Sequence, residues 1–222
     1  MTDRYSFDTR EEFLGKLKEL VDSGVPKKSI DTFTPYPVHE AEELLGLQRR
    51  APALLREAAP RVGEFLQSLV MPDGGFRGRA DHSDLYYTAF GVSCLRALER
   101  EHDCEAVAHY AKSFGAGEGL DLVHLSCLVR VAADCGLAFG HEARDAILAR
   151  VAALRAGDGG FGSAPGAARG TAYGAFLALG ILQDLGREIS GAEALVDACL
   201  GLRAEDGGFG NEPGRRAGAT PA

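Results

Sequence analysis

The pentapeptide DGGFG occurs at Asp158–Gly162 and again at Asp206–Gly210, and a related version, DGGFRG, stands at Asp73–Gly78. Each follows a stretch with a helical pattern, and the two earlier ones in the chain also precede such a stretch. Paired glycines supply the positive-φ backbone on which helices commonly end, and the phenylalanine can pin the turn to a neighbour. We therefore interpret DGGF as a turn that reverses the chain between two helices.

The sequence around these turns repeats as well, and a repeat of this kind decides the architecture. GGFRGRADHSDLYYTAFGVSCLRAL aligns on its phenylalanine with GGFGSAPGAARGTAYGAFLALGIL, which has one extra loop residue, and GGFGNEPGRRAGATPA begins a further copy. A worn copy, GAGEGLDLVHLSCLVRVAADCG, lies between the first two. Four residues then occupy one equivalent position at spacings typical of helical-pair repeats: Asp84, Asp121, Gly170 and Gly218.

The segments between the turns predict helices of two kinds. Residues 141–156 are amphipathic, with one apolar stripe formed by Ala143, Ile147, Val151 and Leu154. Residues 84–98 and 170–186 are apolar nearly all round, which predicts burial on every side. This alternation favours two concentric helical layers, an all-α, α/α toroid, whose inner helices face a central space that is either filled or holds an apolar ligand.

The first 50 residues differ from the repeats and form a separate region. Residues 9–24 predict a helix capped by Thr9, and residues 25–38 form an irregular connection with three prolines. The repeat region is expected over residues 51–222. Pro60 lies within its first helical stretch, which is therefore either kinked there or divided into two short helices.

Charge and composition restrict the class of protein. The net charge of −8 argues against a nucleic-acid-binding surface, and no run of eighteen apolar residues predicts a membrane span. The polar, acidic start does not resemble a signal peptide. Five cysteines without a C-x-x-C pair favour free thiols in a reducing cytoplasm, with Cys94, Cys127 and Cys199 as small buried hydrophobic residues.

Over residues 55–222 the three DGGF turns, each followed at matched spacing by the start of an inner helix, resemble the prenyltransferase and squalene-oxidase repeat. The overall plan is similar to the β subunits of protein prenyltransferases of the Rab geranylgeranyltransferase type. The last copy stops at GATPA, where its inner helix should begin. We therefore expect an incomplete ring, to be closed by further sequence, by a helical partner equivalent to the family's α subunit, or by a second copy of this chain.

The resemblance implies an isoprenoid in the central cavity, its diphosphate at the rim, and a zinc ion that activates a cysteine thiolate for attack on the prenyl carbon. The family's zinc ligands lie in D-x-C and D-x-[FY]-H-T patterns. The second pattern matches residues 84–88, with Tyr87 at the histidine position, whereas Gly170 and Ala172 stand at the positions equivalent to the D-x-C pair. His124 stands at that position in the worn copy, three residues after Asp121 and on the same helical face. Asp121 and His124 are thus candidate zinc ligands, to be completed by Asp84 or by Asp81 and His82.

The other candidate residues lie near the predicted rim. Arg169 matches the histidine with which the family contacts diphosphate, and an arginine there can bind phosphate through two hydrogen bonds. Arg77 and Arg79 follow the first turn and are candidates for the same role. For all three the alternative is a solvated side chain.

Each remaining candidate also has a structural alternative. Asp84 is either a ligand or acid–base group, acting with Tyr87, or only the cap of its helix. Tyr86, Tyr87 and Tyr173 either line an isoprenoid cavity and offer hydroxyls to phosphate, or simply pack. His124 is either a ligand or a hydrogen-bonded core histidine.

Two functions are consistent with these residues. The first is a prenyltransferase β-subunit-like protein that binds an isoprenyl diphosphate and transfers the prenyl group to a thiol acceptor. The second is a non-catalytic α/α-toroid binding or scaffold module that has lost the zinc site, which the absence of D-x-C at the aligned position favours. Whether the chain is an enzyme stays open. The absence of D-x-D-D and of tryptophan makes a triterpene cyclase a poor alternative.

Overall fold

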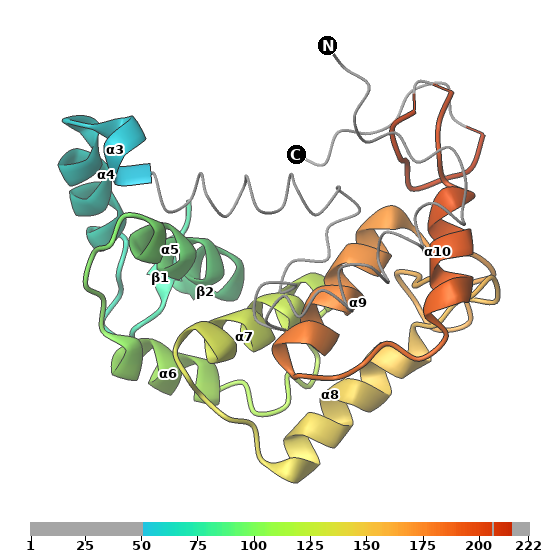
Figure 1. Cartoon of the computed structure of the whole chain (residues 1–222). Helices are drawn as coiled ribbons and strands as arrows, with labels where there is room; N and C mark the ends of the chain where they lie inside the picture. Colours follow the sequence, from blue (N-terminus) through green and yellow to red (C-terminus); the bar gives the residue numbers. More distant parts are fainter. Residues whose placement is uncertain (1–50, 206, 215–222) are drawn as a thin grey trace, which may run out of the picture. The chain divides into compact units, whose positions relative to one another are not determined.

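The structure is a computed structural model, and it describes residues 51–205 and 207–214, which fall within one compact unit. These residues are mostly helical, as the sequence predicts (Figure 1). The helix predicted at residues 9–24, the connection after it, Asp206 and Gly218 lie outside the described residues. Within the described ranges, no helix has both the length and the apolar character needed to cross a membrane.

The helices follow one another with short connections. Their bounds are α3 Ala51–Leu55, α4 Ala58–Gln67, α5 Leu85–Ala97, α6 Cys104–Lys112, α7 Leu122–Asp134, α8 His141–Ala153, α9 Ala172–Asp184 and α10 Ala192–Leu200. Two short strands, β1 Phe76–Arg77 and β2 Ser83–Asp84, pair in antiparallel fashion, with Phe76 opposite Asp84. This ladder was not predicted, because two residues are too few to produce an alternating pattern.

The stretch that contains Pro60 is divided into two helices. The chain breaks between α3 and α4 at Arg56, whose φ is 47°. Pro60 lies in the first turn of α4, where its missing N–H removes no helical hydrogen bond. The second of the two predicted alternatives is therefore correct.

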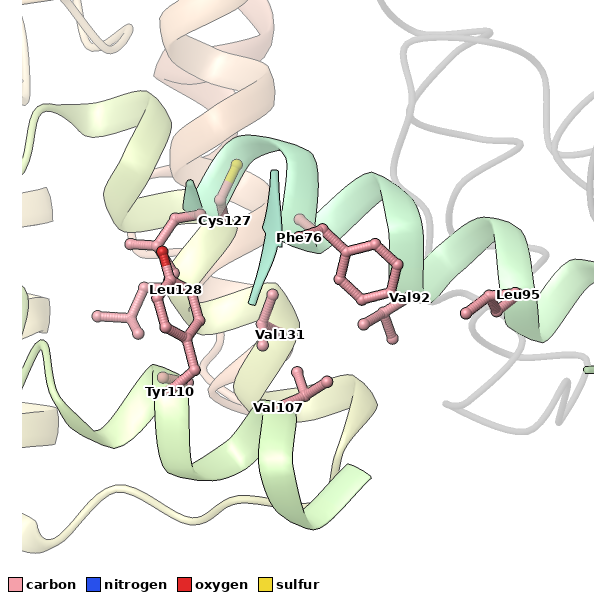
Figure 2. Close-up of a cluster of buried hydrophobic side chains, with 11 residues drawn as sticks. Phe76, Val92, Leu95, Val107, Tyr110, Cys127, Leu128 and Val131 are labelled. Atoms are coloured by element: carbon pink, nitrogen blue, oxygen red, sulfur yellow. The ribbon is translucent and has the colours of Figure 1, made fainter. Parts of the chain in front are cut away.

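Helices α5, α7 and α9 form the centre of the described unit. α7 packs against α5 on one side and α9 on the other, and α4, α6 and α10 pack against α5, α7 and α9 respectively. A cluster of buried side chains joins the first turn to α5, α6 and α7 (Figure 2). Its members are Phe76, Leu85, Ala89, Val92, Leu95, Val107, Tyr110, Ala111, Cys127, Leu128 and Val131.

The three DGGF turns share one backbone structure. The first glycine of each has φ between 84° and 90°, and its N–H donates to the carbonyl three residues earlier. The N–H of that earlier residue donates in return to the carbonyl of the second glycine. The phenylalanine pairs with the residue six positions before it. The glycines concerned are Gly74, Gly159 and Gly207, and the paired residues are Val70 with Phe76, Arg155 with Phe161 and Arg203 with Phe209.

The aspartate of the motif ties the turn to the helix that follows. Asp73 Oδ1 accepts from Gly75 N at 3.1 Å and from Ser83 Oγ at 2.5 Å, just before α5. Asp158 Oδ1 accepts from Gly160 N at 2.9 Å and from Gly170 N at 3.0 Å, just before α9. In the first and second copies, DGGF therefore both reverses the chain and holds the start of the helix that follows.

The phenylalanine of the first turn packs on that same helix. Phe76 is only 1% exposed, and its ring lies so close to Gly91 of α5 that a Cβ added there would be 2.3 Å from it. This contact confirms the expectation that the phenylalanine pins the turn to its neighbour.

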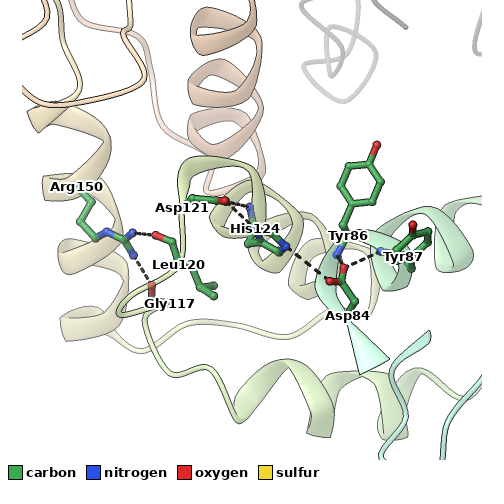
Figure 3. Close-up of polar contacts among 8 residues, drawn as sticks. All are labelled: Asp84, Tyr86, Tyr87, Gly117, Leu120, Asp121, His124 and Arg150. Atoms are coloured by element: carbon green, nitrogen blue, oxygen red, sulfur yellow. Dashed lines mark hydrogen bonds and ion pairs between the residues drawn. The ribbon is translucent and has the colours of Figure 1, made fainter. Parts of the chain in front are cut away.

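The turn before α5 also contacts α6, and the turn before α9 also contacts α10. An added Cβ at Gly74 would lie 2.2 Å from the carbonyl oxygen of Ala106 in α6, and one at Gly159 would lie 2.6 Å from Cβ of Ala194 in α10. In the worn copy, a side chain replaces this close approach: Arg150 of α8 donates to the carbonyls of Gly117 and Leu120 (Figure 3). Neighbouring pairs are thus joined in chain order.

The prediction that α5 and α9 are buried on every side is wrong. α5 has α4, α7 and the strand ladder as neighbours, but its Phe90 is 55% exposed, and Phe176 of α9 is 49% exposed. Cys94 lies on the exposed part of α5, whereas Cys127 is buried and Cys199 half-buried, and all five cysteines are free. The stripe predicted for α8 is confirmed, since Ile147 and Val151 are buried.

Candidate functional site

The starts of α5, α7 and α9 are each capped by a side chain. Asp84 Oδ1 accepts from Tyr86 N at 2.7 Å, Asp121 Oδ1 accepts from His124 N at 2.8 Å, and Thr171 Oγ1 accepts from Gly174 N at 2.8 Å. The capping role considered for Asp84 is therefore confirmed. The cap of α9 is Thr171 rather than its aligned neighbour Gly170, whose N–H is used by Asp158.

His124 lies between the two capping carboxylates (Figure 3). Its Nδ1 is 2.8 Å from Asp121 Oδ1, and its Nε2 is 3.8 Å from Asp84 Oδ2. The backbone N–H of His124 lowers the pKa of Asp121, slight burial opposes this, and the imidazole lowers the pKa further. The predicted shared face of Asp121 and His124 is confirmed, but the histidine is half-buried at the surface rather than enclosed in the core.

These three residues do not form a three-ligand zinc site. Asp121 already occupies Nδ1, so a metal can approach only Nε2 and would find Asp84 as its second protein ligand. Asp121 would then orient the ring without touching the metal. Asp81, which was expected to complete the site with His82, instead pairs with Arg77 at 3.0 Å. Catalytic zinc normally has three protein ligands, and the described residues around His124 supply two.

Large aromatic side chains are exposed on α5 and α9, the helices on either side of α7. They form the aromatic surface, which consists of Tyr86, Tyr87 and Phe90 of α5 and Tyr173 and Phe176 of α9, each 40–55% exposed. The rings of Tyr86 and Phe90 are 4.8 Å apart, and those of Tyr173 and Phe176 are 6.4 Å apart.

Two pKa shifts relate the aromatic surface to the capping aspartates. Burial raises the pKa of Tyr173, and negative charge at Tyr86, Cys127 and Asp121 adds to the rise. Burial also raises the pKa of Cys127 to about 11, with smaller contributions from the charges of Asp84 and Asp121. The charge of Asp121 therefore influences groups on α7 and α9, and that of Asp84 influences a group on α7.

The candidate arginines are all on the surface. Arg77 is held by its ion pair with Asp81, whereas Arg79 and Arg169 are exposed. Arg169 lies two residues before the cap of α9, close in sequence to Tyr173. The backbone of Gly78, between Arg77 and Arg79, packs on the ring of Tyr87, where an added Cβ would lie 2.1 Å from that ring.

A second cluster of polar residues, His102, Cys104 and Cys135, was missed by the sequence analysis. It joins the start of α6 to the end of α7, and each of its residues is half-buried. The H-x-C spacing of the first two was the available sequence signal. The third ligand lies 31 residues further along the chain, so no local pattern contains it.

No protein-family model matches this chain, and no curated protein or solved structure matches it significantly. The likeness to prenyltransferase repeats therefore rests on the turn motifs and on the residues that follow them.

Proposed function

We propose that this protein binds an isoprenyl diphosphate on an α/α-toroid scaffold, with the apolar chain on the aromatic surface. The observation that supports this proposal is the exposure of five large rings on the helices that the sequence makes most apolar. Soluble proteins rarely leave such a patch open unless a ligand or partner covers it. The three equivalent turns and the alternation of helices support the toroid.

The isoprenoid chain fits the chemistry of this surface. Tyrosine and phenylalanine rings offer flat apolar area at little cost in conformational entropy. Each CH₂ group that such a chain buries contributes about 0.8 kcal/mol. A chain of fifteen or twenty carbons can thus bind through the aromatic surface without any strong polar contact.

The diphosphate requires positive charge, because the helix starts are already neutralised. Asp84 and Asp121 accept the N–H groups that an anion would otherwise use, and their carboxylates repel phosphate. We assign this role to Arg169 and Arg79, which are exposed. Arg77 would have to leave Asp81 to take part.

Prenyl transfer is a separate matter from binding. The family's reaction uses three zinc ligands, and His124 and Asp84 offer only two, so we derive no transfer step. The use of both aspartates as helix caps favours the second candidate function, a non-catalytic module in which these residues serve the fold. In that case a helical partner or a second copy of the chain covers the aromatic surface.

Calorimetric titration of the full-length chain with geranylgeranyl diphosphate, with and without zinc, tests the proposal. We expect micromolar binding without added zinc. Phe176→Ser should weaken it, and Phe65→Ser, at an exposed ring of α4 outside the aromatic surface, should not. Binding that appears only with zinc would instead support a prenyltransferase function.

The Arg169→Ala variant tests the head-group assignment, with Arg187→Ala as an exposed control. Reduced affinity for the diphosphate in the first variant alone is expected. If no binding is detected, and light scattering shows a dimer that Phe176→Ser dissociates, the scaffold function replaces the ligand-binding one.

A further inference from the structure

Three metal-binding side chains converge on one point between α6 and α7. Sγ of Cys104 is 3.2 Å from Nε2 of His102, and the ligand atoms of these two residues and Cys135 all lie within 4.8 Å of one another. In a tetrahedral zinc site with ordinary bond lengths, neighbouring ligand atoms stand roughly 3.5–3.8 Å apart. Small side-chain rotations would therefore bring all three onto one ion.

The backbone holds these residues in place without a metal. The N–H of Cys104 donates to the carbonyl of His102 at 3.0 Å, which folds the histidine back toward the first residue of α6. Asp103, between them, caps α6 by accepting from Ala106 N at 2.9 Å. The ligands at this end are thus carried by a capped helix start.

The third ligand is fixed by the end of α7. Cys135 N donates to the carbonyl of Val131 at 3.0 Å, and Gly136 has a φ of 67°, which ends the helix. Leu137 N then donates to the carbonyl of Ala132 at 2.7 Å. Because α6 packs against α7, both halves of the cluster are fixed relative to each other.

The donor atoms select the type of metal. Two thiols and one imidazole suit Zn²⁺ and other soft or borderline ions, whereas Mg²⁺ and Ca²⁺ require oxygen ligands. Two thiolates would neutralise the charge of a divalent ion. The adjacent Arg96–Asp134 ion pair is also neutral, so the occupied site would carry no net charge.

We propose that His102, Cys104 and Cys135 bind one Zn²⁺ ion, with a fourth position open to water or an external ligand. No other histidine, cysteine or acidic residue of the described ranges joins the group, which leaves that position open. Cys135, the C-cap of α7, lies eleven positions after His124, a rise of about 16 Å along the helix. The zinc site is therefore distinct from the His124 region.

Metal titration of the reduced full-length chain tests the site directly. We expect one equivalent of Zn²⁺ to be taken from a chromophoric chelator, and Co²⁺ to give thiolate-to-metal absorption bands. Cys104→Ser and Cys135→Ser should each weaken Zn²⁺ binding at least about 100-fold, the share of a single ligand in a thiolate site. Cys94→Ser and His109→Asn, at exposed positions outside the cluster, should leave it unchanged, and so should His124→Asn.

Alkylation of the unaltered protein provides a test that does not depend on folding of the variants. Zn²⁺ should protect Cys104 and Cys135 from a thiol reagent, as measured by peptide mass spectrometry, and leave Cys94 reactive. The proposal is overturned if the reduced chain binds no Zn²⁺, or if protection does not involve these two cysteines. A Cys104–Cys135 disulfide that re-forms in the presence of Zn²⁺ would overturn it as well.

Discussion

The turn before α5 and the turn before α9 have the same backbone but are completed by different atoms. In the first copy, Asp73 binds the hydroxyl of Ser83, and Phe76 N donates to Thr88 Oγ1 at 2.9 Å. In the second, Asp158 binds the backbone N–H of Gly170 directly, because glycine lets the two chain segments approach. One geometry is thus reached through side chains in one copy and through backbone in the other.

The caps of the two helices differ in the same way. Asp84 caps α5 with a carboxylate, whereas Thr171 caps α9 with a hydroxyl. A neutral cap therefore suffices for α9, which predicts that the negative charge of Asp84 is dispensable for α5. The feature common to both helices is a side-chain oxygen at the cap, and the charge of that oxygen differs between them.

The largest expected effect comes from removing the phenylalanines. Phe76→Ala should lower the free energy of unfolding by about 3–5 kcal/mol, because the ring is buried in the cluster that joins the first turn to α5, α6 and α7. Phe161→Ala should cost a similar amount, since Phe161 is 3% exposed and lies under Arg155. Urea denaturation measures both. A cost for Phe161→Ala below half that of Phe76→Ala would show that the two turns are not energetically equivalent.

Replacing a glycine by alanine inside α5 and inside α9 should change the free energy of unfolding in opposite directions. Gly91→Ala places a methyl group against the ring of Phe76 and should destabilise the protein by about 1–3 kcal/mol. Gly180→Ala meets nothing closer than 4.0 Å and should stabilise it by about 0.5–1 kcal/mol through helix propensity. Thermal and urea unfolding of the pair decide the point, and equal signs would contradict the packing described for Gly91.

Exchanging the caps tests whether the carboxylate is dispensable. Asp84→Thr copies the cap of α9 and should change stability by less than about 0.5 kcal/mol, while Asp84→Ala should cost about 1 kcal/mol. The comparison is made by chemical denaturation at neutral pH. Equal losses in both variants would mean that α5 depends on the charge itself.

The smallest effect is expected at Asp121, in the worn copy between the two. Its pKa in the folded protein lies below the ordinary 3.8, so its carboxylate stabilises the fold above that pH. This contribution is lost as the pH falls through the lowered pKa. The stability difference between the unaltered protein and Asp121→Asn should therefore shrink from about pH 5 to about pH 2. A difference that grows over this interval would reverse the assigned sign.

Local requirements made much of the fold predictable. The positive φ of Gly74 and Gly159 and the burial of Phe76 follow from the turn itself, so repeated letters were enough to identify them. The capping role of Asp84 was visible for the same reason, whereas that of Asp121 was found only in the structure. The exposed face of α5 was not, because an apolar helix does not reveal which of its sides lacks a neighbour.

Contacts between distant residues were harder to anticipate. The approach of His124 to Asp84 followed only from aligning the repeats, and its distance depends on how α7 packs on α5. No sequence pattern predicted the hydrogen bonds from Arg150 to the turn before α7, because this side chain takes the place of a glycine contact present in the other copies. Cys135 joined His102 and Cys104 only through the packing of α6 on α7.

The contacts that the turns before α5, α7 and α9 make with α6, α8 and α10, respectively, have a consequence for folding. A chain linked in this way is close to one-dimensional, since each pair is stabilised mainly by its immediate neighbours. Cooperativity is then transmitted link by link, and amide exchange should be slowest around α7, which has neighbours on both sides, and faster toward α4 and α10. An added pair would be held both by the packing of its apolar helix, as α7 packs on α5 and α9, and by one such turn contact.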